Sequence, residues 1–132
     1  MSSSIPKKRV SNRDMGGLTA SLVLFSNHKF SCFSRELSRF IYEPVTGQLA
    51  YSEPRGYAVF SYGDHFPIYY YDHDAKLWYG NEDKYSRTTS RHQSQAWPKG
   101  VGRDQIIWVN TRTLQNLVDK GYLKSVSERI TA

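Results

Sequence analysis

The feature that most constrains the fold is the stretch GYAVFSYGDHFPIYYYDHDAKLWYG at residues 56–80, which is dense in aromatic and β-branched side chains. Gly63-Asp64 and Asp72-His73-Asp74 interrupt it with residues that favour turns. Aromatic runs separated by such turns predict a meander of three strands. These strands are expected at 57–62, 67–71 and 76–80.

The predicted first strand alternates in a way that assigns its two faces. Three of its side chains should lie on one face of the sheet and three on the other, because successive residues of a strand point in opposite directions. The first set is Tyr57, Val59 and Ser61, and the second is Ala58, Phe60 and Tyr62. With helices covering one side of the sheet, about half of the aromatic residues in the two later strands, Tyr69, Tyr70, Tyr71, Trp78 and Tyr79, should be core.

Segments on either side of the meander supply further elements. SRELSRFIY at 34–42 has apolar residues at helical spacing and predicts a short amphipathic helix. VTGQLAY at 45–51 predicts a tight hairpin around Thr46 and Gly47, or a strand that begins at Gln48. The apolar run LTASLVLF at 18–25 is expected to be a core strand or short helix.

The C-terminal part predicts one more strand and the clearest helix. QIIWVN at 105–110 has four consecutive large apolar residues, which is typical of a strand buried on both faces. TRTLQNLVDK at 111–120 places apolar residues at helical spacing, with Asn110 or Thr111 as its N-cap and Gly121 at its stop.

Together these elements predict an α+β fold, a small antiparallel meander sheet packed by a C-terminal helix and a short N-terminal helix on one face. The length of 132 residues fits one domain, expected at 17–132. Residues 1–16 are rich in serine and basic residues and predict a flexible, disordered basic tail.

The distribution of charge points to a functional surface. The chain carries a net charge of +6, which favours polyanionic partners. Residues 64–83 have a balance of −4, whereas residues 84–103 contain no acid and have a balance of +5. The second segment begins with KYSRTTSRHQSQAW, in which basic, hydroxyl and amide side chains are concentrated.

This basic segment has the residue types that hold nucleic acid. Lysine and arginine neutralise phosphates, and serine and threonine hydroxyls donate to phosphate oxygens. A helix starting within SRTTSRHQ would be capped by Ser86 or Thr88. The predicted nucleic-acid contacts are Lys84, Tyr85, Arg87, Thr88, Thr89, Ser90, Arg91, His92, Gln93, Lys99 and Arg103. Exposed members of the set Tyr69, Tyr70, Tyr71, Trp78 and Tyr79 would stack on unpaired bases.

Enzyme chemistry, metals and cofactors receive less support from the sequence. His65 and His73 would lie about 26 Å apart along an extended strand, too far to share a metal ion, so no metal site is predicted. No phosphate-binding glycine loop is present, and no cofactor is predicted. Ser90 and His92 do not face each other on a helix, so a hydrolase using His92 would need a partner from elsewhere in the fold.

The sequence also gives an expected compartment. The single cysteine, Cys32, cannot form an internal disulfide, which fits a reducing cytoplasm. No stretch approaches the roughly 20 apolar residues that span a bilayer, so no membrane association is expected. The run at 18–25 is too short for a signal peptide and lacks a cleavage pattern.

Two stretches of the chain resemble a known but uncharacterised family of small proteins from bacteriophages and other mobile elements. They are FSYGDHFPI at 60–68 and WYGNEDKYSRTTSRHQSQ at 78–95. In that family a strand with Ser-Tyr-Gly leads to an aromatic strand and then to a Tyr-Ser-x-Thr-Thr-Ser-x-His-Gln segment. The matching positions here are Tyr85, Ser86, Thr88, Thr89, Ser90, His92 and Gln93. The resemblance implies a phage or mobile-element origin and action in a host cytoplasm, and it carries no activity.

Two main functions follow as hypotheses. The first is an accessory protein that binds nucleic acid or another polyanion through the basic segment. The second is an inhibitor or modulator of a host protein complex, in defence or transcription, that uses the aromatic sheet face and charged loops. A small hydrolase using His92 is a further alternative.

Overall fold

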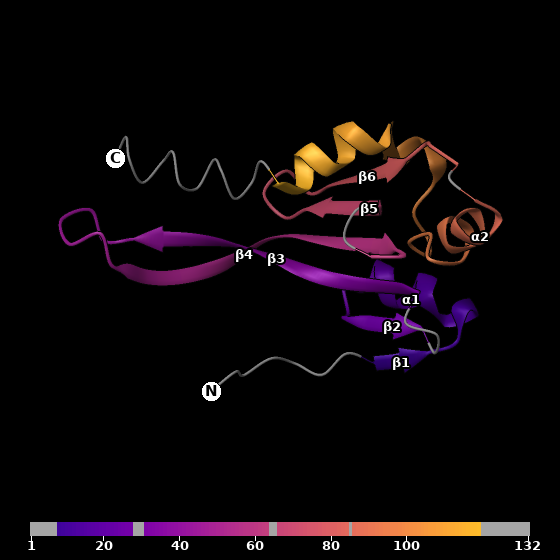
Figure 1. Ribbon diagram of the computed structural model, residues 1–132, viewed down its shortest axis with the longest axis horizontal. Coiled ribbons are helices and arrows are strands. Elements are labelled where there is room, and N and C mark those ends of the chain that lie inside the picture. Colours follow the sequence, from indigo (N-terminus) through magenta and orange to yellow (C-terminus); the bar gives the residue numbers. More distant parts are fainter. Residues whose placement is uncertain (1–7, 28–30, 64–65, 85, 120–132) are drawn as a thin grey trace.

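The computed structural model describes residues 8–27, 31–63, 66–84 and 86–119, which form a mixed α+β fold around one seven-stranded sheet (Figure 1). The strands are β1 (Lys8–Val10), β2 (Phe25–Asn27), β3 (Cys32–Tyr42), β4 (Leu49–Ser61), β5 (Pro67–Asp72), β6 (Leu77–Asn81) and β7 (Ile106–Val109). The helices are α1 (Met15–Ala20), α2 (Arg87–Gln95) and a third at 111–119. Short 3-10 turns lie at Asn12–Asp14 and Arg103–Gln105.

The strands lie in the sheet in the same order as in the chain. From β2 to β6 each strand pairs antiparallel with the next, which confirms the predicted meander at the centre of the sheet. The edge strands β1 and β7 are parallel to β2 and β6. A purely antiparallel sheet was therefore the wrong prediction: α1 and α2 each return the chain so that the next strand runs in the same direction.

Two local predictions are also wrong. The expected flexible tail at 1–16 is ordered over residues 8–16, because β1 pairs with β2 and Met15 is completely buried. The helix expected at 34–42 is strand β3, which pairs with β4 from Cys32↔Ser61 to Tyr42↔Leu49. A short apolar spacing fits both helix and strand, and here the cross-strand pairing decides.

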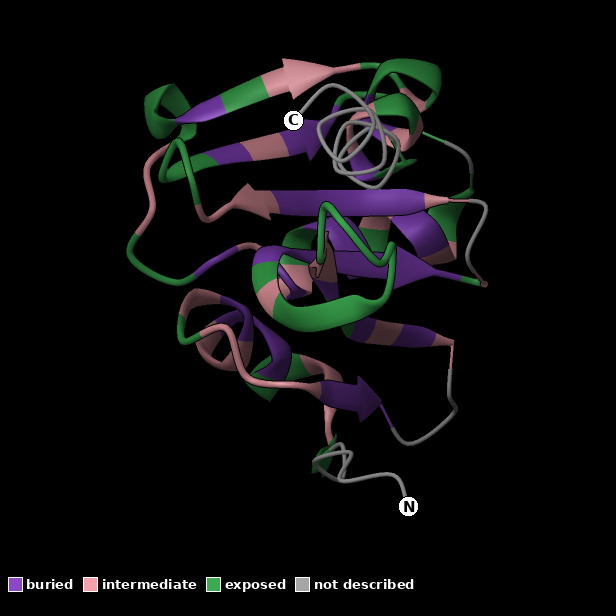
Figure 2. Ribbon diagram, turned by 90° about the vertical axis from the view of Figure 1, so that its left-hand side faces the viewer, coloured by how far each residue is buried: buried purple, intermediate pink, exposed green. Residues whose placement is uncertain are grey.

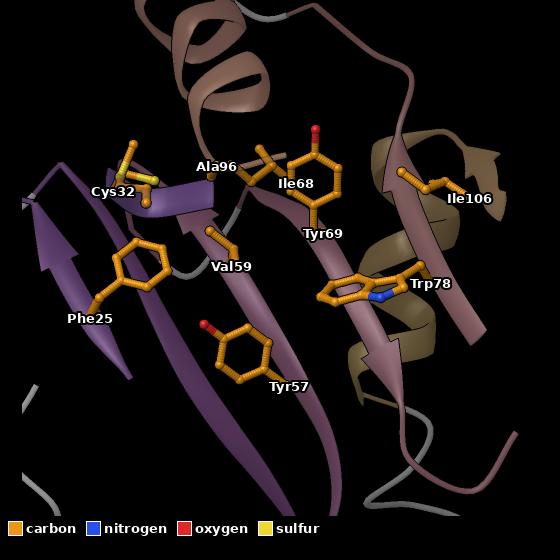
Figure 3. Packing of buried hydrophobic residues seen from close by; sticks show 10 residues of the cluster. Phe25, Cys32, Tyr57, Val59, Ile68, Tyr69, Trp78, Ala96 and Ile106 are labelled. Carbon is orange, nitrogen blue, oxygen red and sulfur yellow. The ribbon is translucent and has the colours of Figure 1, made fainter. Parts of the chain in front are cut away.

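The sheet has a hydrophobic cluster on each face. One cluster contains Tyr57 and Val59 of β4 together with Met15 of α1 and Ala96 at the end of α2 (Figure 3). The other contains Ala58 and Phe60 of β4 together with Leu114 and Val118 of the helix at 111–119. The predicted alternation of β4 is thus confirmed, but helices cover both faces of the sheet and not one.

The C-terminal helix is capped as predicted. The side chain of Asn110 accepts a hydrogen bond of 2.8 Å from the backbone N–H of Thr113. Its predicted stop at Gly121 lies outside the described residues. Strand β7 was expected to be buried on both faces, but it is an edge strand and Ile107 is 42% exposed.

Strands β3 and β4 extend beyond their neighbours as a two-stranded arm, defined here as residues 39–53 (Figure 1). Gly47 has a φ of 72° and makes the tight turn at its tip, as the sequence predicts. Most of the arm is exposed, including Val45 at 90%, Leu49 at 55% and Tyr51 at 56% (Figure 2). Its described ion pairs join Arg39 to Glu53 and to Asp74.

Candidate functional site

The predicted binding segment folds as helix α2, which begins where the sequence indicates. Ser86 is its N-cap, and the Ser86 hydroxyl accepts a hydrogen bond of 3.1 Å from the backbone N–H of Thr89. The helix ends at Gln95, and Pro98 follows soon after. The cap predicted for Ser86 is confirmed. Tyr85 lies outside the described residues.

One side of α2 is built into the protein. Thr89 and His92 are buried, and both meet the hydroxyl of Ser61 at the end of β4. The Ser61 Oγ lies 2.8 Å from Nδ1 of His92 and 3.3 Å from Oγ1 of Thr89. These contacts hold the helix against the central strand of the sheet.

Gln93 connects α2 to the end of β6. Its Nε2 donates to the backbone oxygens of Asn81, at 3.1 Å, and Asp83, at 2.8 Å. Its Oε1 accepts from Nζ of Lys84 at 3.3 Å, and its backbone oxygen accepts from the hydroxyl of Tyr69. The amide of Gln93 is therefore fully used within the protein, and Gln93 is 4% exposed.

The structure thus divides the predicted contacts into two groups. Thr89, His92 and Gln93 lie in the interior, where they bond the protein's own groups and do not face solvent. Thr88 and Ser90 are half-buried. The basic residues remain on the surface, and all of them are exposed: Lys84, Arg87, Arg91, Lys99 and Arg103.

The pair formed by Ser61 and His92 has the distance of a nucleophile and its base, but its surroundings do not support catalysis. Both residues are 1% exposed, so a substrate has no access to the hydroxyl. Among the described residues no carboxylate bonds the His92 ring to orient it, as a catalytic triad requires. Burial, and secondarily the charge of Arg91, lower the pKa of His92. The geometry is that of a neutral structural histidine.

Two of the exposed cations converge on a small hollow beside α2. The hollow has a volume of about 80 Å³, and Lys84 and Arg103 both line it. Trp97 and Trp108 also line it, with ring centroids 5.3 Å apart. The guanidinium of Arg103 lies over the Trp108 ring, 4.8 Å from its centroid. Glu82 is the one acidic residue in this lining.

The two tryptophans were missed as site residues at the level of sequence. Both indole N–H groups bond backbone oxygens, those of Val101 and Arg103, and the face of Trp108 lies under the guanidinium of Arg103. The aromatic residues expected to stack are mainly core, since Tyr69, Tyr70 and Trp78 are buried. Placement of Trp108 next to Trp97 depends on the parallel pairing of β6 with β7, which no local pattern revealed.

The remaining chemistry is sparse in the described part of the chain. It contains no group of three or more His, Cys, Asp or Glu side chains arranged to hold a metal ion. His65 lies outside it, so the predicted separation from His73 is not observed. Burial raises the pKa of Cys32 to about 12, so its thiol stays protonated. None of the helices in these residues is both long and apolar enough to cross a membrane.

Comparison with known proteins finds no matching family model, no matching curated protein and no matching solved structure. The resemblance of residues 57–95 to a phage family stays a prediction.

Proposed function

We propose that this protein is a non-catalytic binding protein that holds nucleic acid through the exposed cations around α2. The observation that carries the proposal is the arrangement of Lys84 and Arg103 beside the paired rings of Trp97 and Trp108. Cations that neutralise phosphates next to aromatic faces that stack on bases are the two components of single-strand binding sites. The proposed setting is the cytoplasm of a host cell.

Helix α2 extends this surface. Arg87 and Arg91 are one helical turn apart, so both project from the same exposed side of α2. The opposite side of the helix is fixed by Thr89, His92 and Gln93. In the proposed role these three residues position the helix and do not touch the nucleic acid.

The test is a binding titration with a fluorescein-labelled 20-nucleotide single strand, as DNA and as RNA, read by fluorescence anisotropy. Binding at low salt should weaken steeply as salt rises, because released counterions drive it. If all five cations contact phosphates, the slope of log K against log salt should be about −3.5 on a single strand. Absence of binding to both strands at 50 mM salt would end the proposal.

Matched variants separate this surface from general positive charge. Arg87→Gln with Arg91→Gln, and Lys84→Gln with Arg103→Gln, should each weaken binding and make the salt slope on a single strand shallower by about 1.4. Arg112→Gln is the control, because Arg112 is exposed on the helix at 111–119 and lies outside this surface. The proposal fails if the α2 variants bind as Arg112→Gln does.

The arm supports a second candidate, contact with a host protein. It exposes Val45, Leu49 and Tyr51, and its charged residues Arg39, Glu43 and Glu53 give it a net charge of −1. Exposed apolar side chains without a net positive charge suit a protein surface better than nucleic acid. A host-protein complex that survives nuclease treatment and is lost in Val45→Ser with Tyr51→Ser would favour this candidate.

A further inference from the structure

A second cavity lies on the other side of the sheet from α2. Its volume is about 610 Å³, within the range of small-molecule sites. Part of its wall is apolar, from Leu37 of β3, Phe60 of β4 and Val118 of the C-terminal helix. Phe40 adds a further aromatic ring to the lining.

Arg55 places a buried positive charge at this cavity. The residue is 4% exposed, and its guanidinium donates to the hydroxyl of Tyr70, at 3.1 Å, and to the backbone oxygen of Val118. The Nε–H has no hydrogen-bond partner among the described residues. Within the described chain no carboxylate forms an ion pair with Arg55. A buried guanidinium that lacks a negatively charged partner would be stabilised by an anion bound next to it.

A second buried polar atom belongs to Gln115, another residue that lines the cavity. The Oε1 of Gln115 is buried and accepts no hydrogen bond from any described group, although Nε2 of the same amide donates to Asp119 at 3.3 Å. Buried polar atoms are normally paired, so two unpaired atoms at one cavity require an explanation. The cavity therefore offers an N–H donor with positive charge, a carbonyl acceptor and an apolar wall.

The rim of the cavity limits the charge of what it can hold. Arg35, Glu36 and Asp119 are exposed in the lining, so together with Arg55 the charges there sum to zero. The two carboxylates would repel the second charge of a phosphate dianion. A single negative charge at Arg55 avoids this repulsion, and the apolar wall adds a preference for a hydrophobic body.

We propose that this cavity binds a small monocarboxylate that carries an apolar body and a hydrogen-bond donor. The carboxylate accepts from the Nε–H of Arg55, the donor bonds Oε1 of Gln115, and the apolar body packs against Leu37, Phe60 and Val118. This site is separate from the nucleic-acid surface at α2. The result of its test does not depend on the function proposed for α2.

N-acetyl-L-leucine is a suitable probe, because it has a carboxylate, an amide N–H and an apolar side chain. It is titrated into the ¹⁵N-labelled full-length chain, and backbone amide shifts are followed by NMR. Saturable shifts are expected at residues 35–38 and 115–119. N-acetyl-L-leucinamide, which is neutral, and inorganic phosphate should each bind at least tenfold more weakly. A charge-assisted hydrogen bond is worth about that factor or more.

Variants assign the preference to its residues. Gln115→Ala should keep the native spectrum and weaken N-acetyl-L-leucine binding severalfold, whereas Arg87→Gln should leave it unchanged. Arg55→Met removes both the positive charge and the Nε–H and, where its spectrum stays native, should abolish the preference for carboxylate over carboxamide. If this variant unfolds, the test is whether the unaltered protein binds N-acetyl-L-leucine more tightly than N-acetyl-L-leucinamide.

Three results would overturn the proposal. One is a lack of saturable shifts up to 50 mM probe, and another is equal affinity for the carboxylate and the carboxamide. The third is a set of shifts confined to residues that do not line the cavity.

Discussion

His92 shows how a residue that looks functional in the sequence acts in the fold. Its ring fills interior space between α2 and β4 and bonds Ser61. His92→Ala should lower the free energy of unfolding by about 1–3 kcal/mol, since it leaves the Ser61 hydroxyl short of a partner and opens a cavity. Denaturant unfolding measures this. Arg91→Ala, an exposed neighbour, should stay within about 0.5 kcal/mol of the unaltered protein.

The same histidine predicts a pH dependence. Because its pKa is lowered in the folded protein, the unfolded chain binds the proton first as the pH falls. The contribution of His92 to stability should therefore decline as pH falls through 6.5, and level off below its folded-state pKa. In urea unfolding between pH 7.5 and 5, the stability advantage over His92→Asn should shrink. An advantage that stays constant would contradict the lowered pKa.

Two glycines provide opposite expectations from packing alone. A Cβ on Gly80 would lie 2.7 Å from the Trp108 ring and 2.9 Å from Ile106, so Gly80→Ala should cost about 1–3 kcal/mol of stability. A Cβ on Gly17 in α1 would meet nothing within 4 Å, and Gly17→Ala should stabilise by about 0.5–1 kcal/mol. Thermal melts compare the two, and melting points that shift in the same direction would contradict this packing.

The residues of the candidate site were only partly predictable from sequence. The cap at Ser86 could be predicted, because a hydroxyl side chain just before a polar helical segment is a local signal. The burial of Thr89, His92 and Gln93 could not be predicted. It depends on contacts with Ser61 at the end of β4 and Asn81 at the end of β6, which are distant from α2 in the sequence. The clustering of cations in the sequence was a sound guide to exposure, since charged side chains keep to the surface.

At the scale of elements, the arm should be dispensable for folding. Residues 41–50 belong to neither hydrophobic cluster, and the arm pairs mainly with itself. Joining Phe40 to Ser52 through a two-residue Asn-Gly turn should keep one cooperative unfolding transition and change the melting temperature by a few degrees. Circular dichroism on heating checks this, and loss of the transition would show that the arm supports the core.

The arm also shows where sequence patterns are ambiguous. The apolar positions of 34–42 fit a helix as well as a strand over so short a window, so the choice depended on pairing with β4, the next strand in the chain. The aromatic meander was predictable because its strands are neighbours joined by clear turns. Strands β1 and β7 were harder, because parallel pairing leaves no short-range signal.

For the whole molecule, the two clusters share β4 and β5, and these strands should be the most stable part. Amides of residues 57–60 and 68–70 should exchange with solvent most slowly, because helices or strands cover them on both faces. Amides of the arm should exchange fastest among the strands. Native-state hydrogen exchange measured by NMR tests this order, and an arm as protected as the centre would contradict it.

The arm and α2 lie at opposite ends of the longest axis of the molecule (Figure 1). If a host protein bound the tip of the arm and a nucleic-acid strand bound beside α2, the two partners would lie at opposite ends of the molecule. Neither partner would then block the binding of the other. With both proposed partners bound, the chain would link a protein to a nucleic acid through a single sheet, with no need for two separate domains.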